Sequence, residues 1–168
     1  MNVVIRTYTP ADLESCRALW AELTEHHRQI YDDPTIGGEQ SGLAFDAHLA
    51  RIELDRIWVA EANGTVYGLV GLIVEGDEGE VEPIVVTTAQ RGKGVGHALL
   101  TRVRQEAEVL KLRFLGMKPV ARNLDAIRFF YQAGFQLLGH VELFTDISPS
   151  SGRPWKEGIV LHGHRLKY

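Results

Sequence analysis

The chain has 168 residues, of which 45% are hydrophobic and 24% charged, a composition typical of one soluble globular domain over residues 1–168. A net charge of −4 argues against a general nucleic-acid or anionic-membrane binder, and no apolar run approaches the roughly 20 residues of a membrane span. Because no secretory signal is visible and Cys16 is the single cysteine, we expect a cytoplasmic protein without an internal disulfide.

The amino-terminal third is predicted to hold one strand and two helices. Residues 3–9 are β-branched, and apolar residues then recur at helical spacing over 13–23. The segment 26–42 is polar and rich in turn formers, which predicts an irregular loop, and 43–54 indicates a second helix. Residues 1–55 hold four Lys/Arg against ten Asp/Glu, so this third is acidic.

A meander of strands is predicted next. Residues 56–62 and 65–75 flank Asn63-Gly64, a pair that favours the tight turn of a β-hairpin. A second turn at 76–79 leads into a third strand at 80–88.

The rest of the chain alternates helices and strands. We expect a helix ending near residue 110, a strand at 112–120, a helix at 122–134, a long strand at 135–147 and one more strand within 155–168. Early meandering strands followed by crossovers predict an α/β fold, in which one mixed central sheet carries helices on both faces.

A glycine-rich segment with the sequence TTAQRGKGVGHALL stands where one of these helices should begin. The start of a helix presents unpaired N–H groups and a partial positive charge. Glycines at 92, 94 and 96 let an anion approach that backbone closely, and Arg91 and Lys93 add charge. The segment therefore predicts a phosphate site.

Two common phosphate motifs do not fit this segment. The P-loop needs Ser or Thr after its lysine, but Gly94 follows Lys93. The dinucleotide fingerprint needs G-x-G-x-x-G near the first strand of its unit, whereas the spacing here is G-x-G-x-G after several strands. A glycine-rich connector without a ligand is the remaining alternative.

The R-x-x-G-x-G pattern at 91–96 instead resembles the signature of the GCN5-related N-acetyltransferases, the GNAT superfamily. A second block, N-x-x-A…G-F, begins at Asn123 and ends at Phe135, and the likeness covers roughly residues 56–140. The resemblance implies a GNAT-like fold and an enzyme that moves an acetyl group from acetyl-CoA to a primary amine by direct transfer in a ternary complex.

The resemblance also implies where acetyl-CoA would bind. The pyrophosphate would lie on the amides of the glycine segment, and the pantetheine arm would pair with strand backbone that a bulge in the fourth strand exposes. Asn123 could contact the cofactor, cap its helix, or both. The implied cofactor residues are Ile84, Val85, Val86, Arg91, Gly92, Lys93, Gly94, Val95, Gly96, His97 and Asn123.

Candidates for proton transfer lie on both sides of this segment. Glu82 stands where many family members carry a general base, and Glu80 is a second candidate because it shares that strand face. Either could instead be a solvated carboxylate. The family's usual acid is a tyrosine at the position of Phe130; Tyr131 is one residue later, so Tyr131, water or no acid at all stays open.

No metal is expected, because the histidine pairs 26–27 and 162/164 lack a third ligand at motif spacing. The acidic amino-terminal third favours a cationic acceptor, although a solvated acidic helix face would give the same composition.

Phe130 stands where the family usually has its tyrosine, so a non-catalytic acyl-CoA-binding module is the alternative function. An enzyme that uses a longer acyl-CoA donor is a second alternative. The last strand could pair with a second copy, so a homodimer is allowed.

Overall fold

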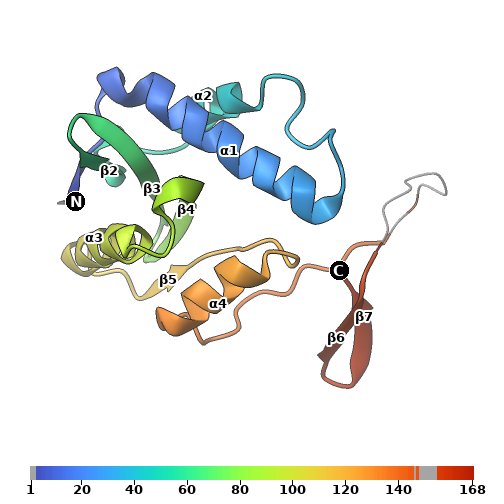
Figure 1. Ribbon diagram of the computed structural model, residues 1–168. Coiled ribbons are helices and arrows are strands. Elements are labelled where there is room, and N and C mark those ends of the chain that lie inside the picture. The colour runs from blue at the N-terminus through green and yellow to red at the C-terminus, as the bar shows by residue number, and fades with distance from the viewer. Residues whose placement is uncertain (1–2, 146, 148–154) are drawn as a thin grey trace.

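The computed structural model describes residues 3–145, 147 and 155–168. Five strands form one twisted sheet in the order β1-β2-β3-β4-β5 (Figure 1). The first four pair antiparallel, and β5 is parallel to β4, so the predicted mixed sheet is confirmed. The strands are β1 (Val4–Thr7), β2 (Ile57–Ala62), β3 (Thr65–Glu75), β4 (Glu78–Val86) and β5 (Phe114–Gly116).

Helices cover both faces of the sheet. In Figure 1, α1 (Leu13–Tyr31) and α2 (Ala44–Leu49) lie above it, while α3 (Val95–Val109) and α4 (Leu124–Gln132) lie below. Short 3₁₀ turns precede α1, α2, β2 and α3. The fold is therefore the predicted α/β sandwich of helix, sheet and helix.

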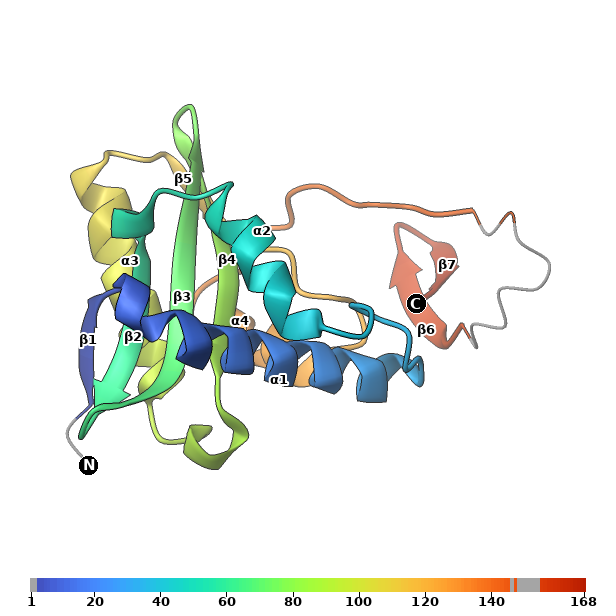
Figure 2. The same ribbon diagram turned by 90° about the horizontal axis from the view of Figure 1, so that it is seen from above.

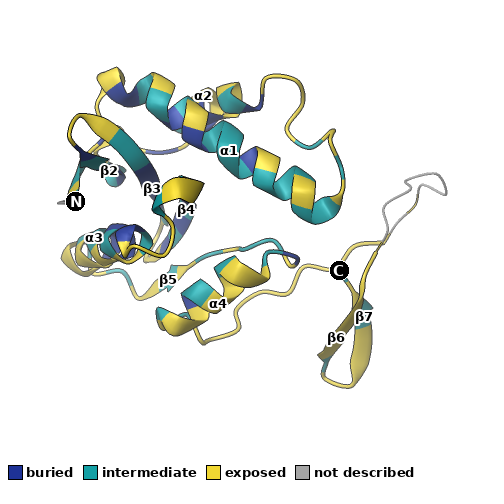
Figure 3. Ribbon diagram, in the orientation of Figure 1, coloured by how far each residue is buried: buried dark blue, intermediate teal, exposed yellow. Residues whose placement is uncertain are grey.

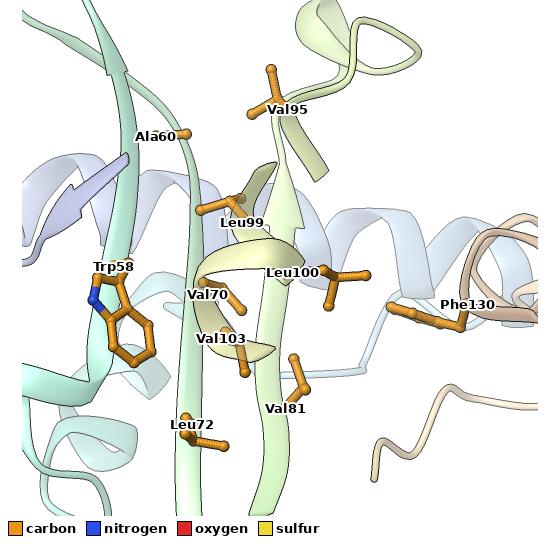
Figure 4. Packing of buried hydrophobic residues seen from close by; sticks show 10 residues of the cluster. All are labelled: Trp58, Ala60, Val70, Leu72, Val81, Val95, Leu99, Leu100, Val103 and Phe130. Atoms are coloured by element: carbon orange, nitrogen blue, oxygen red, sulfur yellow. The ribbon is translucent and has the colours of Figure 1, made fainter. Parts of the chain in front are cut away.

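Each face of the sheet has its own apolar core (Figure 3). On the α3 side, Trp58, Leu99 and Phe130 belong to one buried cluster (Figure 4). On the α1 side, Phe45 and Leu69 are fully buried. Burying one such side chain contributes roughly 1.5–3 kcal/mol, so the two clusters fix the helices on the sheet.

A bulge in β4 interrupts its pairing with β3. Val70 pairs with Ile84 and Leu72 with Val81, so Glu82 and Pro83 together lie opposite Gly71. A Cβ at Gly71 would collide with the backbone oxygen of Glu82, which explains the glycine. The extra residue also shifts the alternation of side chains: Val81 belongs to the α3-side core, whereas Val85 belongs to the α1-side core.

β4 and β5 separate soon after they begin. Their parallel pairing covers only Glu78–Glu80 and Phe114–Gly116. Beyond Glu80, no described strand pairs with β4 on that side, and the backbone oxygen of Val86 instead accepts a hydrogen bond from Arg91 Nε.

The amino-terminal elements differ from expectation at two places. The predicted loop at 26–42 begins with helix, because α1 runs on to Tyr31. No Gly or Pro occurs over 26–31, and Arg28 donates to the backbone oxygens of Ile36 and Gly38, so the following loop folds back on the helix. The second helix is shorter than the predicted 43–54, since α2 covers only Ala44–Leu49.

The long strand predicted at 135–147 is wrong for the described residues of that range, none of which is in a strand. Figure 2 shows this segment leaving the sheet in an extended path. The expected single strand after it is instead a hairpin, β6 (Glu157–Leu161) and β7 (His164–Lys167), which forms its own two-stranded sheet. The alternating apolar pattern of 135–147 favours a strand, but a strand also needs a neighbour to pair with.

Candidate active site

The glycine segment forms the turn that leads from β4 into α3. Gly92 and Gly94 have φ values of 71° and 84°, and an added Cβ at either would meet nothing within 4 Å. The left-handed backbone, not crowding, therefore requires glycine here. Gly94 is the N-cap of α3 and supplies no side-chain hydrogen bond, so the first N–H groups of this helix are open to an anion.

The two cations of the segment bond to the backbone before α3. Arg91 Nε donates to the backbone oxygen of Val86, the last residue of β4, at 3.0 Å, and Lys93 Nζ donates to that of Ala89, in the following 3₁₀ turn, at 2.8 Å. Both side chains lie on exposed residues. They add positive charge beside the helix start.

The remaining residues of the segment also serve the packing of α4. Val95 is buried in the α3-side core, and a Cβ at Gly96 would lie 3.1 Å from Cζ of Phe129. His97 meets the same ring edge-on at a centroid distance of 4.9 Å. Val95 and Gly96 therefore each have a structural reason of their own, and their backbone groups are the part that a ligand could use.

The end of β4 runs directly into this segment. Val85 pairs with Leu69 and is buried on the α1 side, while Ile84 and Val86 pack against the α3-side core. These three residues lie beyond the point where β5 leaves β4. An extended ligand could pair with this strand edge as an additional strand would.

Asn123 caps α4. Its side-chain oxygen accepts a hydrogen bond from the backbone nitrogen of Ala126 at 3.1 Å. Capping, one of the two predicted roles, is thus present, and a contact with the cofactor remains a prediction.

Glu82 lies on the bulge, on the α1 and α2 side of the sheet. Its Oε1 is 3.3 Å from Nη1 of Arg51 and 3.8 Å from Nδ1 of His48. The Glu82 side chain is 34% exposed, so water and a substrate can reach it. The bulge therefore presents a carboxylate between a surface arginine and a buried histidine.

The sequence analysis missed His48 and Arg51. His48 is 3% exposed and lies against Trp20 and Phe45, with ring centroids at 5.2 and 6.2 Å. Burial lowers the pKa of His48 below its ordinary value, although the nearby carboxylate of Glu82 opposes this, so the ring is neutral at neutral pH. The available signal was a histidine on the apolar face of the second predicted helix.

Glu80, the second candidate base, forms an ion pair. Its Oε2 lies 2.6 Å from Nζ of Lys118, just after β5. The hydrogen bond to Glu80 raises the pKa of Lys118. Glu82 is the better placed of the two carboxylates, because Glu80 is engaged where β4 and β5 still pair.

The two aromatic residues near the end of α4 have different environments. Phe130 is 6% exposed and belongs to the α3-side core (Figure 4). Tyr131 is 60% exposed. The structure does not bring the Tyr131 hydroxyl to the side of the helix that Phe130 occupies, as expected for adjacent helical residues.

Neither Cys16 nor a metal cluster adds to this site. Cys16 is fully buried, and burial raises the pKa of its thiol to about 12, so it is not an activated nucleophile. Over 3–145, 147 and 155–168, no group of three or more His, Cys, Asp or Glu residues is arranged to hold a metal ion. In the same residues, no helix is long and apolar enough to cross a membrane.

Several carboxylates of the acidic amino-terminal third have partners. Asp46 pairs with Arg17 at 2.6 Å, and Glu25 pairs with Arg28 at 3.3 Å. Glu22 accepts hydrogen bonds from the backbone and the hydroxyl of Thr88, which links α1 to the turn before the glycine segment. The negative field expected from composition is therefore partly neutralised.

Comparison with known proteins agrees with this geometry. The sequence model of the acetyltransferase (GNAT) domain matches residues 53–137, half of the chain. Streptothricin acetyltransferase of Escherichia coli is 33% identical over 69 residues, which is 41% of this chain and 39% of that enzyme. The matched region thus spans well under half of that relative.

Solved structures share the fold at low sequence identity. A GNAT-family acetyltransferase of Staphylococcus aureus Mu50 has a TM-score of 0.69 and 15% identity, with 90% of this chain and 96% of that chain covered. PaiA N-acetyltransferase of Thermoplasma acidophilum, solved with coenzyme A, has a TM-score of 0.69 and 17% identity, with 84% and 94% covered. With the domain match and the glycine segment, these findings show that the chain belongs to the GNAT acetyltransferase family.

Proposed function

We propose that the chain is an N-acetyltransferase that moves the acetyl group of acetyl-CoA to a primary amine by direct transfer in a ternary complex. One observation carries the proposal: β4 leaves β5 after Glu80, its unpaired end leads through a turn to the glycine-lined start of α3, and Glu82 lies on the bulge beside that opening. A phosphate site, an open strand edge and a carboxylate thus follow one another along a single strand.

Each part has a chemical task. The amides of residues 91–97 would hold the pyrophosphate, and the backbone of 84–86 would pair with the pantetheine arm. Bound acetyl-CoA supplies the thioester that is cleaved. Glu82 would take a proton from the amine, directly or through a water molecule, because only a neutral amine is nucleophilic. Tyr131 or water would give a proton to the departing thiolate.

The acceptor is proposed to be an amine that is cationic in water. Glu82 faces the α1 and α2 side, so the amine would enter from there. A carboxylate both attracts a protonated amine and accepts its proton, whereas the ion pairs of α1 leave less negative charge for attraction at long range. The likeness to a streptothricin acetyltransferase supports acetyl transfer as the reaction class.

The test is thiol release from acetyl-CoA with a panel of amines, together with calorimetry of coenzyme A binding. Binding and acceptor-dependent thiol release are the expected results. Binding without release from any amine would favour the acyl-CoA-binding module that Phe130 leaves open, and faster release from a longer acyl donor would replace acetyl as the transferred group. No detectable binding would contradict the whole proposal.

A homodimer is proposed as the assembly state. Apolar side chains of the extended segment after α4 are exposed, with Leu137 88%, Leu143 70% and Ile147 90% accessible. Such a stretch is rare on an isolated soluble chain and is typical of surfaces that another chain covers. Sedimentation of the full chain measures this directly, and a monomer at all concentrations would contradict it.

A further inference from the structure

His48 is a buried polar side chain without a hydrogen-bond partner. Neither Nδ1 nor Nε2 has one among the residues that the structure describes, although the side chain is only 2% exposed. A buried donor or acceptor left unpaired costs roughly 1–3 kcal/mol. A residue that lowers stability in this way calls for a functional reason.

The orientation of the ring supplies that reason. Nδ1 lies 3.8 Å from Oε1 of Glu82, and Arg51 approaches the same oxygen at 3.3 Å. Both contacts fall on one oxygen of the carboxylate. The 3.8 Å separation at Nδ1 is longer than a hydrogen bond, and hydrogen bonds at catalytic sites commonly tighten when substrates bind.

The surroundings of His48 limit what the ring can do. Trp20 and Phe45 hold it at centroid distances of 5.2 and 6.2 Å. Burial and Arg51 oppose the charged ring, whereas the carboxylate of Glu82 and a backbone contact with the same residue favour it. A neutral imidazole carries one N–H and a carboxylate only accepts, so the tautomer with the proton on Nδ1 matches Glu82.

We propose that His48 is a positioning residue for the transfer reaction, in which its Nδ1–H donates to Oε1 of Glu82. With Arg51 on the same oxygen, this bond holds the carboxylate so that its other oxygen faces the acceptor amine. The inference rests on the proposed role of Glu82 as the base. His48 itself touches neither the amine nor the thioester.

Two substitutions separate positioning from packing. His48→Asn keeps an N–H donor near the place of Nδ1 but fills the space poorly, whereas His48→Leu packs well against Trp20 and Phe45 and has no donor. We expect kcat to fall about 100-fold in His48→Leu and by less than about tenfold in His48→Asn, since a misplaced reacting group costs about that much. Coenzyme A affinity should stay at its original value in both variants. A packing role would give the reverse order in kcat, which would overturn the proposal.

A second measurement does not depend on how the variants fold. Nitrogen-15 spectra of the histidines in the original chain, recorded with coenzyme A and an acceptor amine, should show His48 protonated on Nδ1, and Glu82→Ala, which removes the acceptor, should shift the proton toward Nε2. A proton on Nε2 in the original chain overturns the proposal. If Glu82→Gln keeps the original kcat, the base role falls and the positioning role with it; if Glu82→Gln is impaired while His48→Leu outperforms His48→Asn, only the positioning role falls.

Discussion

The two halves of the proposed active site are built in different ways. Apart from Asn123, the proposed cofactor half is one contiguous stretch, from the end of β4 at residue 84 to the first turn of α3 at 97. The acceptor half brings together side chains distant in sequence: Arg51 and Glu82, for example, are 31 positions apart and meet through a bulge and a short helix. A contiguous half depends on local backbone conformation, whereas an assembled half depends on how the elements pack.

The largest effect should come from the acceptor half, in Glu82→Gln. The amide cannot accept the proton of the amine, so kcat should fall by about 10²–10⁴. Coenzyme A affinity, measured by calorimetry, should not change, because the substitution leaves the glycine segment intact. Glu78→Gln, at the exposed start of β4, is the matched control. A normal kcat in Glu82→Gln would remove Glu82 from the mechanism.

The corresponding change in the cofactor half is Gly94→Val. A β-branched residue at a φ of 84° is strained by about 1–3 kcal/mol and covers the helix start, so the Kd for coenzyme A should rise at least tenfold. The shape of the pH profile of kcat should stay the same. Gly38→Val is the matched control, since Gly38 has a φ of 67° and open space but lies outside the site. An unaltered Kd would separate the segment from cofactor binding.

The same contrast explains what could be predicted from the sequence. The glycines at 92 and 94 encode a local backbone conformation, so their pattern predicted the turn and the helix start that the structure has, and the phosphate site there stays a prediction. Glu82 became a candidate base through the family resemblance, because it stands a fixed distance before that segment. His48 was not predicted, because its contact with Glu82 depends on the bulge opposite Gly71 and on the packing of α2. No local pattern in the sequence encodes either feature.

The carboxyl-terminal segment shows the same limit in the fold itself. The strands from 57 to 86 were predicted closely, because each is followed by a tight turn and pairs with its sequence neighbour. Residues 135–147 have an alternating pattern too, but the described residues of that range pair with no strand and form none. Local propensity marks where a strand can form, whereas pairing decides whether it does.

A smaller effect on the acceptor half is expected for Gly71→Ala. The added methyl would collide with the backbone oxygen of Glu82 and lie 2.8 Å from Cδ1 of Ile52. Overpacking of this kind costs roughly 1–3 kcal/mol of stability, and a moved carboxylate should lower kcat several-fold with coenzyme A affinity unaltered. Gly116→Ala, whose Cβ would meet only ordinary contacts, is the control for thermal unfolding and kcat. Equal kcat in the two variants would show that the bulge does not position Glu82.

Tyr131→Phe should have a still smaller effect. The Tyr131 side chain is exposed, and Phe130 occupies the buried position beside the α3-side core. If water protonates the thiolate, kcat should change far less than the roughly 100-fold that a general acid contributes. A loss of that size in steady-state thiol release would identify Tyr131 as the acid and would add α4 to the elements that carry catalytic residues.

The smallest effect concerns the stability of the fold at acidic pH. It distinguishes the acceptor half from the cofactor half in an unfolding experiment that needs no substrate. Burial lowers the pKa of His48 in the folded chain, so the folded state favours the neutral ring. Stability from this group is therefore complete above the unfolded pKa of about 6.5 and is lost as the pH falls from there through the folded pKa. Burial lowers the pKa of His27 in the same way. Denaturant unfolding at a series of pH values should show a decline below about pH 6.5 that becomes shallower in His48→Leu, whereas Gly94→Val should leave its slope unchanged. An equally steep decline in His48→Leu would mean that the pKa of His48 is the same in the folded and the unfolded chain, so that burial does not hold the ring in the neutral form that the bond to Glu82 requires.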